Sequence, residues 1–267
     1  PQKYHLGLSK SLYQKKEYGL ALIEIETAAK LNPADLKTQE ILIGMYSLFL
    51  RLDKAEKALI RLIESANEKD PLKSRSYQEW GDIAVLQGKM KAAKERYDKA
   101  KELGDPQGIA KTTLKEFPDL STTVDKLPLN PNELFINPTN SLNRKGEIFA
   151  HFGMHQRALG IYSLVLRMEP SNLAALLNMA TSNYQNKKYN RAISILERLL
   201  VIHPNHENIL SHRLLLARAY VMKGDHGDGL KNVDLALKLN PNAKYMITSD
   251  PVFEKLRGLK GFQSLMK

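Results

Sequence analysis

Apolar, small and polar positions follow one pattern that returns several times along the chain. The stretch from Tyr77 to Pro106 shows it in full. A large apolar residue is followed by a small residue, by an apolar or aromatic residue three positions later, and by a turn. A second segment then begins near an alanine and ends before a proline. Two helix-length segments around a turn predict a unit of two α-helices.

Three markers of this pattern return in register. The small residue of the first segment is found at Ser9, Gly81, Gly146, Ala180 and Ala217, with Tyr46 as the exception. The small residue that opens the second segment is found at Ala21, Ala58, Ala93, Ala158, Ala192 and Gly229. The closing proline is found at Pro33, Pro71, Pro106, Pro170, Pro204 and Pro241. Most steps are 34 to 38 residues, and a longer step of 64 or 65 separates the third copy from the fourth.

Each marker has a packing role. Gly and Ala let two helices approach where a larger side chain would keep them apart. Glycines such as Gly88, Gly153 and Gly224 supply a left-handed turn between the two helices. The proline cannot continue a helix but is tolerated in a first turn, so it starts the next unit. Because no unit can bury its apolar face alone, the stacked units are expected to form one continuous core.

The unit resembles the tetratricopeptide repeat, which has about 34 residues and the pattern W-x2-L-G-x2-Y, then A-x3-F, then P. The best copies read Tyr77, Trp80, Gly81, Ala84, Gly88, Ala93, Tyr97, Ala100, Pro106 and Leu142, Gly146, Phe149, Gly153, Ala158, Tyr162, Pro170. The resemblance implies an all-α fold, a right-handed superhelical solenoid of antiparallel helix pairs with a C-terminal capping helix. In this frame Trp80, directly before Gly81, is a packing residue and not a ligand-stacking one.

The expected repeats span about residues 2–35, 39–72, 74–107, 139–172, 173–206 and 210–243 of one solenoid covering residues 1–267. The second is degenerate, because Tyr46 and Asp53 stand where a small residue and a turn glycine are expected. Residues 107–138 form either an irregular insertion, which could fold back into the groove, or a decayed repeat. In either case GIAKTTLKEF is compatible with a short helix. Residues 244–267 are expected to cap the last repeat, with Asp250 before Pro251 as a helix start.

Sequence motifs for catalysis or metal binding are missing. The chain has no cysteine, no Walker loop, no G-x-G-x-x-G, no G-x-S-x-G and no H-E-x-x-H. His151 and His155 are four residues apart, but Gly153 between them marks a turn, and His203 and His206 flank a proline in a loop. We therefore expect exposed turn histidines, no metal, no cofactor and no enzyme activity.

Positive charge is concentrated in the second half of the chain. Residues 139–267 carry +9 of the net charge of +11, a field that favours acidic partners. The Lys and Arg residues are scattered singly along helices, whereas nucleic-acid binding usually requires a clustered basic stripe with aromatic residues. This pattern argues against a nucleic-acid partner.

The resemblance implies that the first helix of each repeat lines a concave groove that binds peptide segments. The expected groove residues are Lys10, Tyr13 and Gln14; Ser47 and Arg51; Glu79 and Asp82; Asn143, Arg144, Glu147 and His151; Asn178, Thr181, Tyr184 and Gln185; and Arg218. Amide side chains both donate and accept hydrogen bonds, which suits a peptide backbone. Arg144 and Arg218 are expected to hold carboxylates.

A chaperone-tail receptor of this family would need a carboxylate clamp of Lys, Asn and Arg residues. In the fourth to sixth repeats only Asn178 fits, since Ser211 and Leu215 occupy other clamp positions. An EEVD-like tail is therefore not the expected ligand.

The sequence thus predicts a non-catalytic scaffold for protein or peptide partners, with acidic segments favoured. Two alternatives stay open: a regulatory or output module of a larger signalling protein, for instance one with a receiver domain, and a basic helical-repeat RNA binder. The start at Pro1 suggests a processed chain or an excised segment. Without a signal-peptide core or an apolar run of about 18 residues, we expect a cytoplasmic protein with no membrane span.

Overall fold

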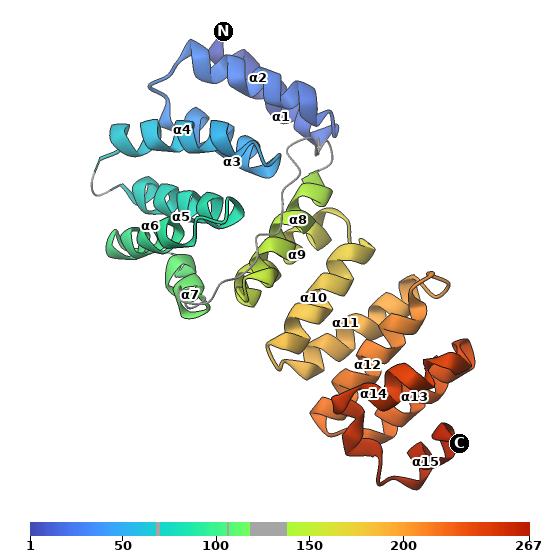
Figure 1. Ribbon diagram of the computed structural model, residues 1–267. Helices are drawn as coiled ribbons and strands as arrows, with labels where there is room; N and C mark the ends of the chain where they lie inside the picture. The colour runs from blue at the N-terminus through green and yellow to red at the C-terminus, as the bar shows by residue number, and fades with distance from the viewer. Residues whose placement is uncertain (68–69, 106, 118–137) are drawn as a thin grey trace. The chain divides into compact units, whose positions relative to one another are not determined.

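The computed structural model describes residues 1–67, 70–105, 107–117 and 138–267, and every regular element in these residues is a helix (Figure 1). The expected all-α helical repeat fold is confirmed. The first seven helices are α1 Gln2–Gln14, α2 Tyr18–Leu31, α3 Leu36–Leu48, α4 Leu52–Ser65, α5 Pro71–Leu86, α6 Met90–Glu102 and α7 Ile109–Lys115. The next six are α8 Pro138–His151, α9 His155–Met168, α10 Leu173–Gln185, α11 Tyr189–Ile202, α12 Ile209–Lys223 and α13 His226–Leu239.

Successive helices pack as pairs through the small residues that the sequence singles out. In the first pair, the buried Ser9 hydroxyl donates a hydrogen bond to the carbonyl oxygen of Ala21 at 2.7 Å. In the third pair, Gly81 lies against the ring of Tyr97, so closely that an added Cβ would be 2.7 Å from a ring carbon. These contacts show why a large side chain is excluded from the marker positions.

The turns inside the helix pairs use left-handed backbone, as expected at Gly88, Gly153 and Gly224. Three further turns have the same conformation without glycine: Lys16 has φ 63°, Leu50 has φ 54° and Lys187 has φ 57°. A left-handed conformation costs a non-glycine residue about 1 kcal/mol or more. The tight turn is therefore kept even where the sequence lacks its glycine.

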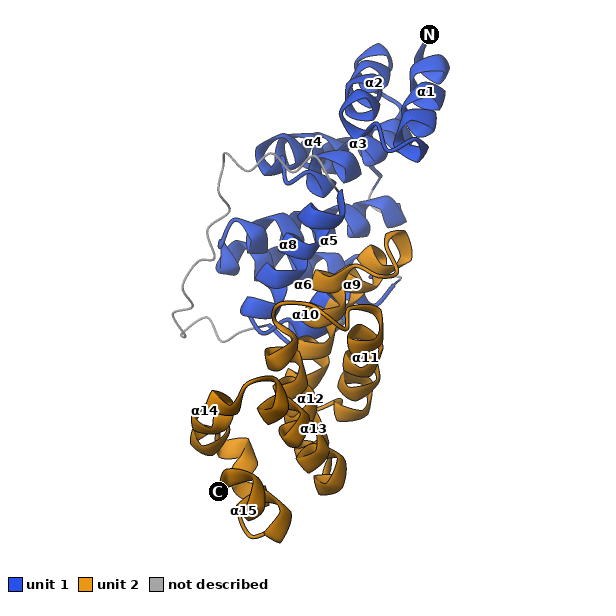
Figure 2. Cartoon of the chain, turned by 90° about the vertical axis from the view of Figure 1, so that its right-hand side faces the viewer, with its two compact units in different colours: residues 1–158 blue, residues 159–267 orange. Residues whose placement is uncertain are grey.

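The chain divides into two compact units, residues 1–158 and residues 159–267 (Figure 2). The single solenoid over residues 1–267 stays a prediction. The boundary lies within α9. In the second unit, α10, α11 and α12 share an apolar core that includes Leu176, Leu196 and Leu216.

The C-terminal segment completes a second core with α12 and α13. It consists of η1 Pro241–Ala243, α14 Lys244–Ser249, η2 Pro251–Leu256 and α15 Lys260–Met266. Phe253, Leu256 and Phe262 are buried in the same cluster as Val221 and Val233. The Asp250 side chain accepts the backbone N–H of Val252 at 2.9 Å and so caps the start of η2.

The short helix expected in GIAKTTLKEF is present as α7, which packs on α6. The rest of the expected insertion, residues 118–137, lies outside the described residues. The two interpretations of that segment, an insertion folded into the groove and a decayed repeat, therefore stay predictions.

Candidate functional site

A cavity of about 690 Å³ opens between α1 and α3 in the first unit. The helix α1 contributes Leu6, Ser9, Lys10, Tyr13 and Gln14, and α3 contributes Ile41, Gly44, Met45 and Leu48. The structure thus brings the three expected groove residues of α1 together on one cavity wall. Volumes of about 300 to 1,000 Å³ are typical of ligand pockets.

The cavity has an apolar lining and a polar edge. Lys10 and Gln14 are exposed and Tyr13 is half-buried. The Tyr13 ring packs edge-on against Tyr18 at a centroid distance of 5.2 Å, and burial, followed by the neighbouring Tyr18, raises the pKa of Tyr13. Tyr13 is therefore a neutral, fixed hydrogen-bonding group beside an ammonium and an amide.

Gly44 leaves space on the cavity wall contributed by α3. A Cβ atom added there would meet nothing within 4 Å. The same glycine borders a smaller pocket of about 220 Å³ between α3, α4 and α5, whose other lining residues include Ile43, Leu59 and Glu79. The accessible face of α3 is therefore hollowed on both sides of Gly44.

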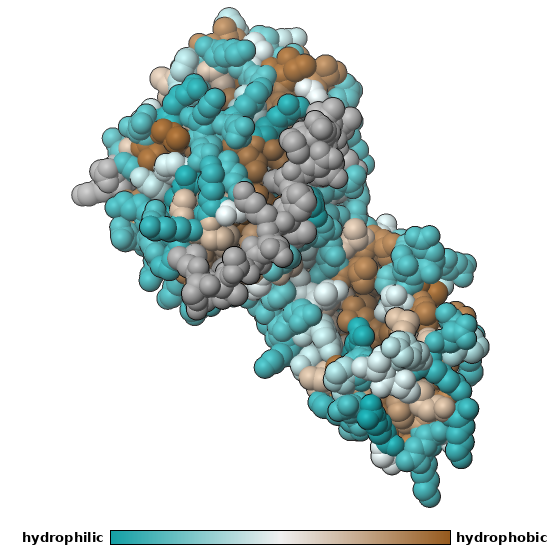
Figure 3. All heavy atoms as spheres, viewed as in Figure 1, coloured by the Kyte–Doolittle hydropathy of each residue, from teal (hydrophilic) through white to brown (hydrophobic). Residues whose placement is uncertain are grey.

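Apolar side chains are exposed around these first helices. Tyr4, Leu20 and Ile23 are each more than half exposed, at 67%, 52% and 56%. On the face drawn in Figure 3, apolar patches interrupt the polar surface over this end of the chain. Such patches are typical of surfaces that contact another molecule.

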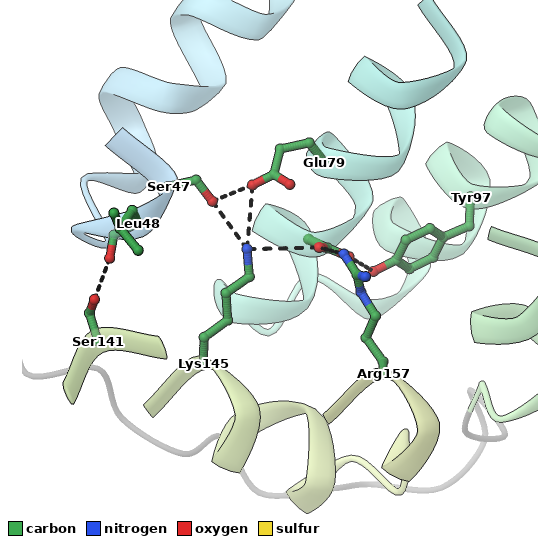
Figure 4. Close-up of polar contacts among 8 residues, drawn as sticks. Ser47, Leu48, Glu79, Tyr97, Ser141, Lys145 and Arg157 are labelled. Atoms are coloured by element: carbon green, nitrogen blue, oxygen red, sulfur yellow. Dashed lines mark hydrogen bonds and ion pairs between the residues drawn. The ribbon is translucent and has the colours of Figure 1, made fainter. Parts of the chain in front are cut away.

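The helix α8 packs against both α3 and α5 (Figure 4). The Ser141 hydroxyl donates a hydrogen bond to the Leu48 carbonyl oxygen. The Lys145 ammonium donates to the Ser47 hydroxyl at 3.1 Å and lies 3.4 Å from the Glu79 carboxylate. Ser47 also donates to Glu79. Ser47 and Glu79, two expected groove residues, are therefore engaged by this chain's own α8.

Asp82 corrects an expectation from the sequence. We expected an acidic group facing the open groove, but the Asp82 side chain is fully buried. Its carboxylate accepts hydrogen bonds from the Arg157 guanidinium, through Nε at 3.2 Å, and from the Tyr97 hydroxyl at 2.6 Å. Lys145 lies 3.8 Å away.

The charges around Asp82 determine its protonation state. Burial alone would raise the pKa of Asp82, but Arg157 and Lys145 outweigh burial and hold the pKa below its usual range. Asp82 also shifts the pKa values of its partners. Burial and the Asp82 charge both raise the pKa of Tyr97. Burial alone would lower the pKa of Arg157, but the Asp82 charge outweighs burial and raises it. The site is therefore a buried ion pair with a neutral tyrosine.

Of the remaining expected residues of the first unit, Arg51 stands directly before α4 and the others lie on α8. Asn143 is buried, and the Arg144 guanidinium lies 3.2 Å from the Glu147 carboxylate. Arg144 thus already has a carboxylate partner in its own helix. The repeat pattern gives no sign of the contacts of Lys145, the residue next to Arg144, because its partners Ser47 and Glu79 are distant in sequence.

In the second unit, the expected residues lie on α10 and α12. Asn178, Thr181 and Tyr184 are half-buried and Gln185 is exposed. The Thr181 hydroxyl donates to the Leu177 carbonyl oxygen in its own helix at 2.9 Å.

Arg218 is paired within the chain. Its guanidinium donates to the Asp250 carboxylate, which stands at the start of η2. Burial raises the pKa of Tyr184, and the positive charge of Arg218 opposes this rise. The guanidinium therefore fixes the C-terminal segment on α12, and a partner's carboxylate would have to compete with Asp250.

Among the described residues, no group of three or more His, Asp or Glu side chains is placed to hold a metal ion. No helix in the same residues is long and apolar enough to cross a membrane.

Residues 150–213 match the family model of the tetratricopeptide repeat. The matched stretch runs from the end of α8 to the start of α12. No curated protein sequence matches the chain.

Solved structures of repeat proteins resemble the chain at low identity. The TPR2AB domain of yeast Sti1, solved in a pHSP90 complex, is 15% identical, with 95% of this chain and 97% of that chain covered and a TM-score of 0.38. YrrB, a TPR protein with an unusual peptide-binding site, is 14% identical, with 82% and 93% covered and a TM-score of 0.43. PilF of Pseudomonas aeruginosa is 13% identical, with 97% of each chain covered and a TM-score of 0.41.

Proposed function

We propose that this tetratricopeptide-repeat chain is a non-catalytic scaffold that binds a peptide segment of a partner protein between α1 and α3. The observation that carries the proposal is the cavity of about 690 Å³ whose wall includes Lys10, Tyr13 and Gln14. An apolar cavity with a few polar groups at its edge is the usual form of a binding site.

The lining supports a ligand with a large apolar side chain. Leu6, Ile41 and Leu48 offer an apolar surface for one large apolar side chain of the partner. Burying such a side chain stabilises a complex by roughly 1.5 to 3 kcal/mol. Gln14 supplies both a donor and an acceptor for the partner's backbone.

The edge of the cavity favours negative charge next to the apolar side chain. Of the described residues that line the cavity, Lys10 alone carries a charge, and its side chain is exposed. We therefore propose a segment with a large apolar residue flanked by Asp or Glu. The expected arginines support this preference less directly, because Arg144 and Arg218 are paired with Glu147 and Asp250. A cytoplasmic location remains a prediction of the sequence.

Peptide selection tests this function. A library of random peptides displayed on phage is selected against the immobilised chain. We expect enrichment of peptides with a large apolar residue and an acidic neighbour, and weaker binding of these peptides to the Lys10→Glu variant. Enriched peptides without this pattern, or equal binding to the variant, would contradict the proposal.

A further inference from the structure

The inner side of α3 and α5 is occupied by another part of the same chain. Each of these helices packs against its pair partner, α4 or α6, and α8 crosses both of them. Figure 4 shows Lys145 and Arg157 reaching from α8 and α9 toward the residues of α3 and α5. The region contacted is the one that the sequence analysis assigns to the open groove.

The contact is complementary in charge. The α5 side supplies Glu79 and Asp82, and the α8–α9 side supplies Lys145 and Arg157. The side chain of Lys145 is 10% exposed and that of Arg157 is 17% exposed. A segment that carries a Lys and an Arg therefore fits this acidic face.

We infer that α8 and α9 are an intramolecular ligand of the α3–α5 face and that they block it against basic segments of partners. This inference rests on the proposed function, since it concerns the surface next to the α1–α3 cavity. In the closed state, Lys145 holds Ser47 and Glu79, and Ser141 holds the end of α3 through the Leu48 carbonyl. Release of α8 exposes an acidic surface that continues from the cavity.

A basic segment that takes the place of α8 and α9 can restore the ion pairs that their release breaks. Buried ion pairs lose much of their attraction to the cost of removing both ions from water. When α8 leaves, Ser47 and Glu79 still have each other as hydrogen-bond partners. A competing basic segment replaces one set of ion pairs with another, so exchange changes the number of paired charges little.

The test uses a fluorescent peptide of residues 138–158 and the full chain, with fluorescence anisotropy as the readout. In wild type, the chain's own α8 competes with the added peptide. Lys145→Ala in the chain weakens the binding of α8 to the α3–α5 face. A larger fraction of the chains then has this face open, so we expect the wild-type peptide to bind about tenfold more tightly. A peptide with Lys145→Ala and Arg157→Ala is the matched control and should bind about tenfold more weakly.

A second variant allows α8 to be crosslinked onto the α3–α5 face. The chain has no cysteine, so Leu48→Cys with Ser141→Cys gives one site for a short thiol crosslinker between α3 and α8. The crosslinked chain should bind no peptide, and the same chain before crosslinking should bind it. Equal binding by the crosslinked and uncrosslinked chains, or no gain with Lys145→Ala, would overturn the inference.

The outcomes also separate this inference from the proposed function. If the crosslink blocks peptide 138–158 while no library peptide binds the α1–α3 cavity, the intramolecular ligand stands and the proposed function fails. If library peptides bind the cavity while the crosslink changes nothing for peptide 138–158, the proposed function stands and the inference fails.

Discussion

The guanidinium of Arg157 donates to the carboxylate of Asp82, 75 residues earlier in the chain, and the Asp82 side chain has no exposed surface. This ion pair joins α9 to α5 inside the first unit. Tyr97 of α6 donates to the same carboxylate. One carboxylate therefore connects three helices that belong to two helix pairs.

Removing one member of this pair should destabilise the first unit strongly. Arg157→Met leaves Asp82 buried without its strongest partner, and we expect a loss of about 3 to 5 kcal/mol in the free energy of unfolding by urea. The double variant Asp82→Leu and Arg157→Met should recover much of this loss. Asp98→Ala, which removes an exposed ion pair with Lys94, is the control and should cost less than about 1 kcal/mol.

The same pair predicts how the first unit responds to acid. The pKa of Asp82 is lower in the folded chain than its ordinary value, so its contribution to stability is complete above the unfolded pKa of about 4. The contribution is lost as the pH falls below about 4 and through the folded pKa. Urea midpoints followed by Trp80 fluorescence from pH 7 to pH 3 should show this loss, and Asp82→Leu with Arg157→Met should reduce it. A midpoint that falls equally in both proteins would contradict the assignment.

Gly81 should not tolerate a side chain. A Cβ added there would lie 2.7 Å from the ring of Tyr97, which is itself fully buried. We expect Gly81→Ala to cost roughly 1 to 3 kcal/mol through overpacking. Gly44→Ala, where a Cβ would meet nothing within 4 Å, should instead stabilise α3 by about 0.5 to 1 kcal/mol. Circular dichroism during urea unfolding measures both, and equal effects would show that the packing argument is wrong.

His212 should make the second unit sensitive to mild acid. Its ring is buried and stacks on His206 at 5.4 Å between centroids, and burial, followed by His206 and His203, lowers its pKa. Below pH about 6.5 the unfolded chain binds a proton that the folded chain excludes, so stability falls as the pH decreases from 6.5 toward the folded pKa.

Thermal unfolding at pH 7.5 and pH 5.5 measures this effect. His212→Gln should reduce the difference between the two melting temperatures. The same exchange at His226, at the start of α13, is the matched control and should leave the difference unchanged. A pH difference that persists in His212→Gln would assign the effect to other groups.

Local patterns predicted the helix pairs and their contacts well. Gly81, which lies against Tyr97, and the left-handed turn at Gly88 follow from one repeat taken alone. The packing role of Trp80 also holds: its Nε1–H donates to Glu56 at 2.8 Å and the Arg96 guanidinium lies 4.0 Å from its ring centroid.

The polar contacts of the site could not be predicted in the same way. The first-helix position of Asp82 predicts a groove residue, but its partner Arg157 belongs to another repeat. A signal was available, since Asp82 stands in the apolar run Gly81 to Leu86, where a charge needs a buried partner. The cavity between α1 and α3 depends on how two helices approach, which repeat periodicity does not specify.

The affinity of one selected peptide for two Gly44 variants tests the central claim most directly. Gly44→Ala adds a methyl group, whereas Gly44→Trp places a large ring at the border of both pockets, in space that the fold leaves open. By fluorescence anisotropy, the account predicts wild-type affinity for Gly44→Ala and at least about tenfold weaker binding for Gly44→Trp, with unchanged circular dichroism. Wild-type affinity in Gly44→Trp would show that the peptide binds elsewhere and would contradict the account.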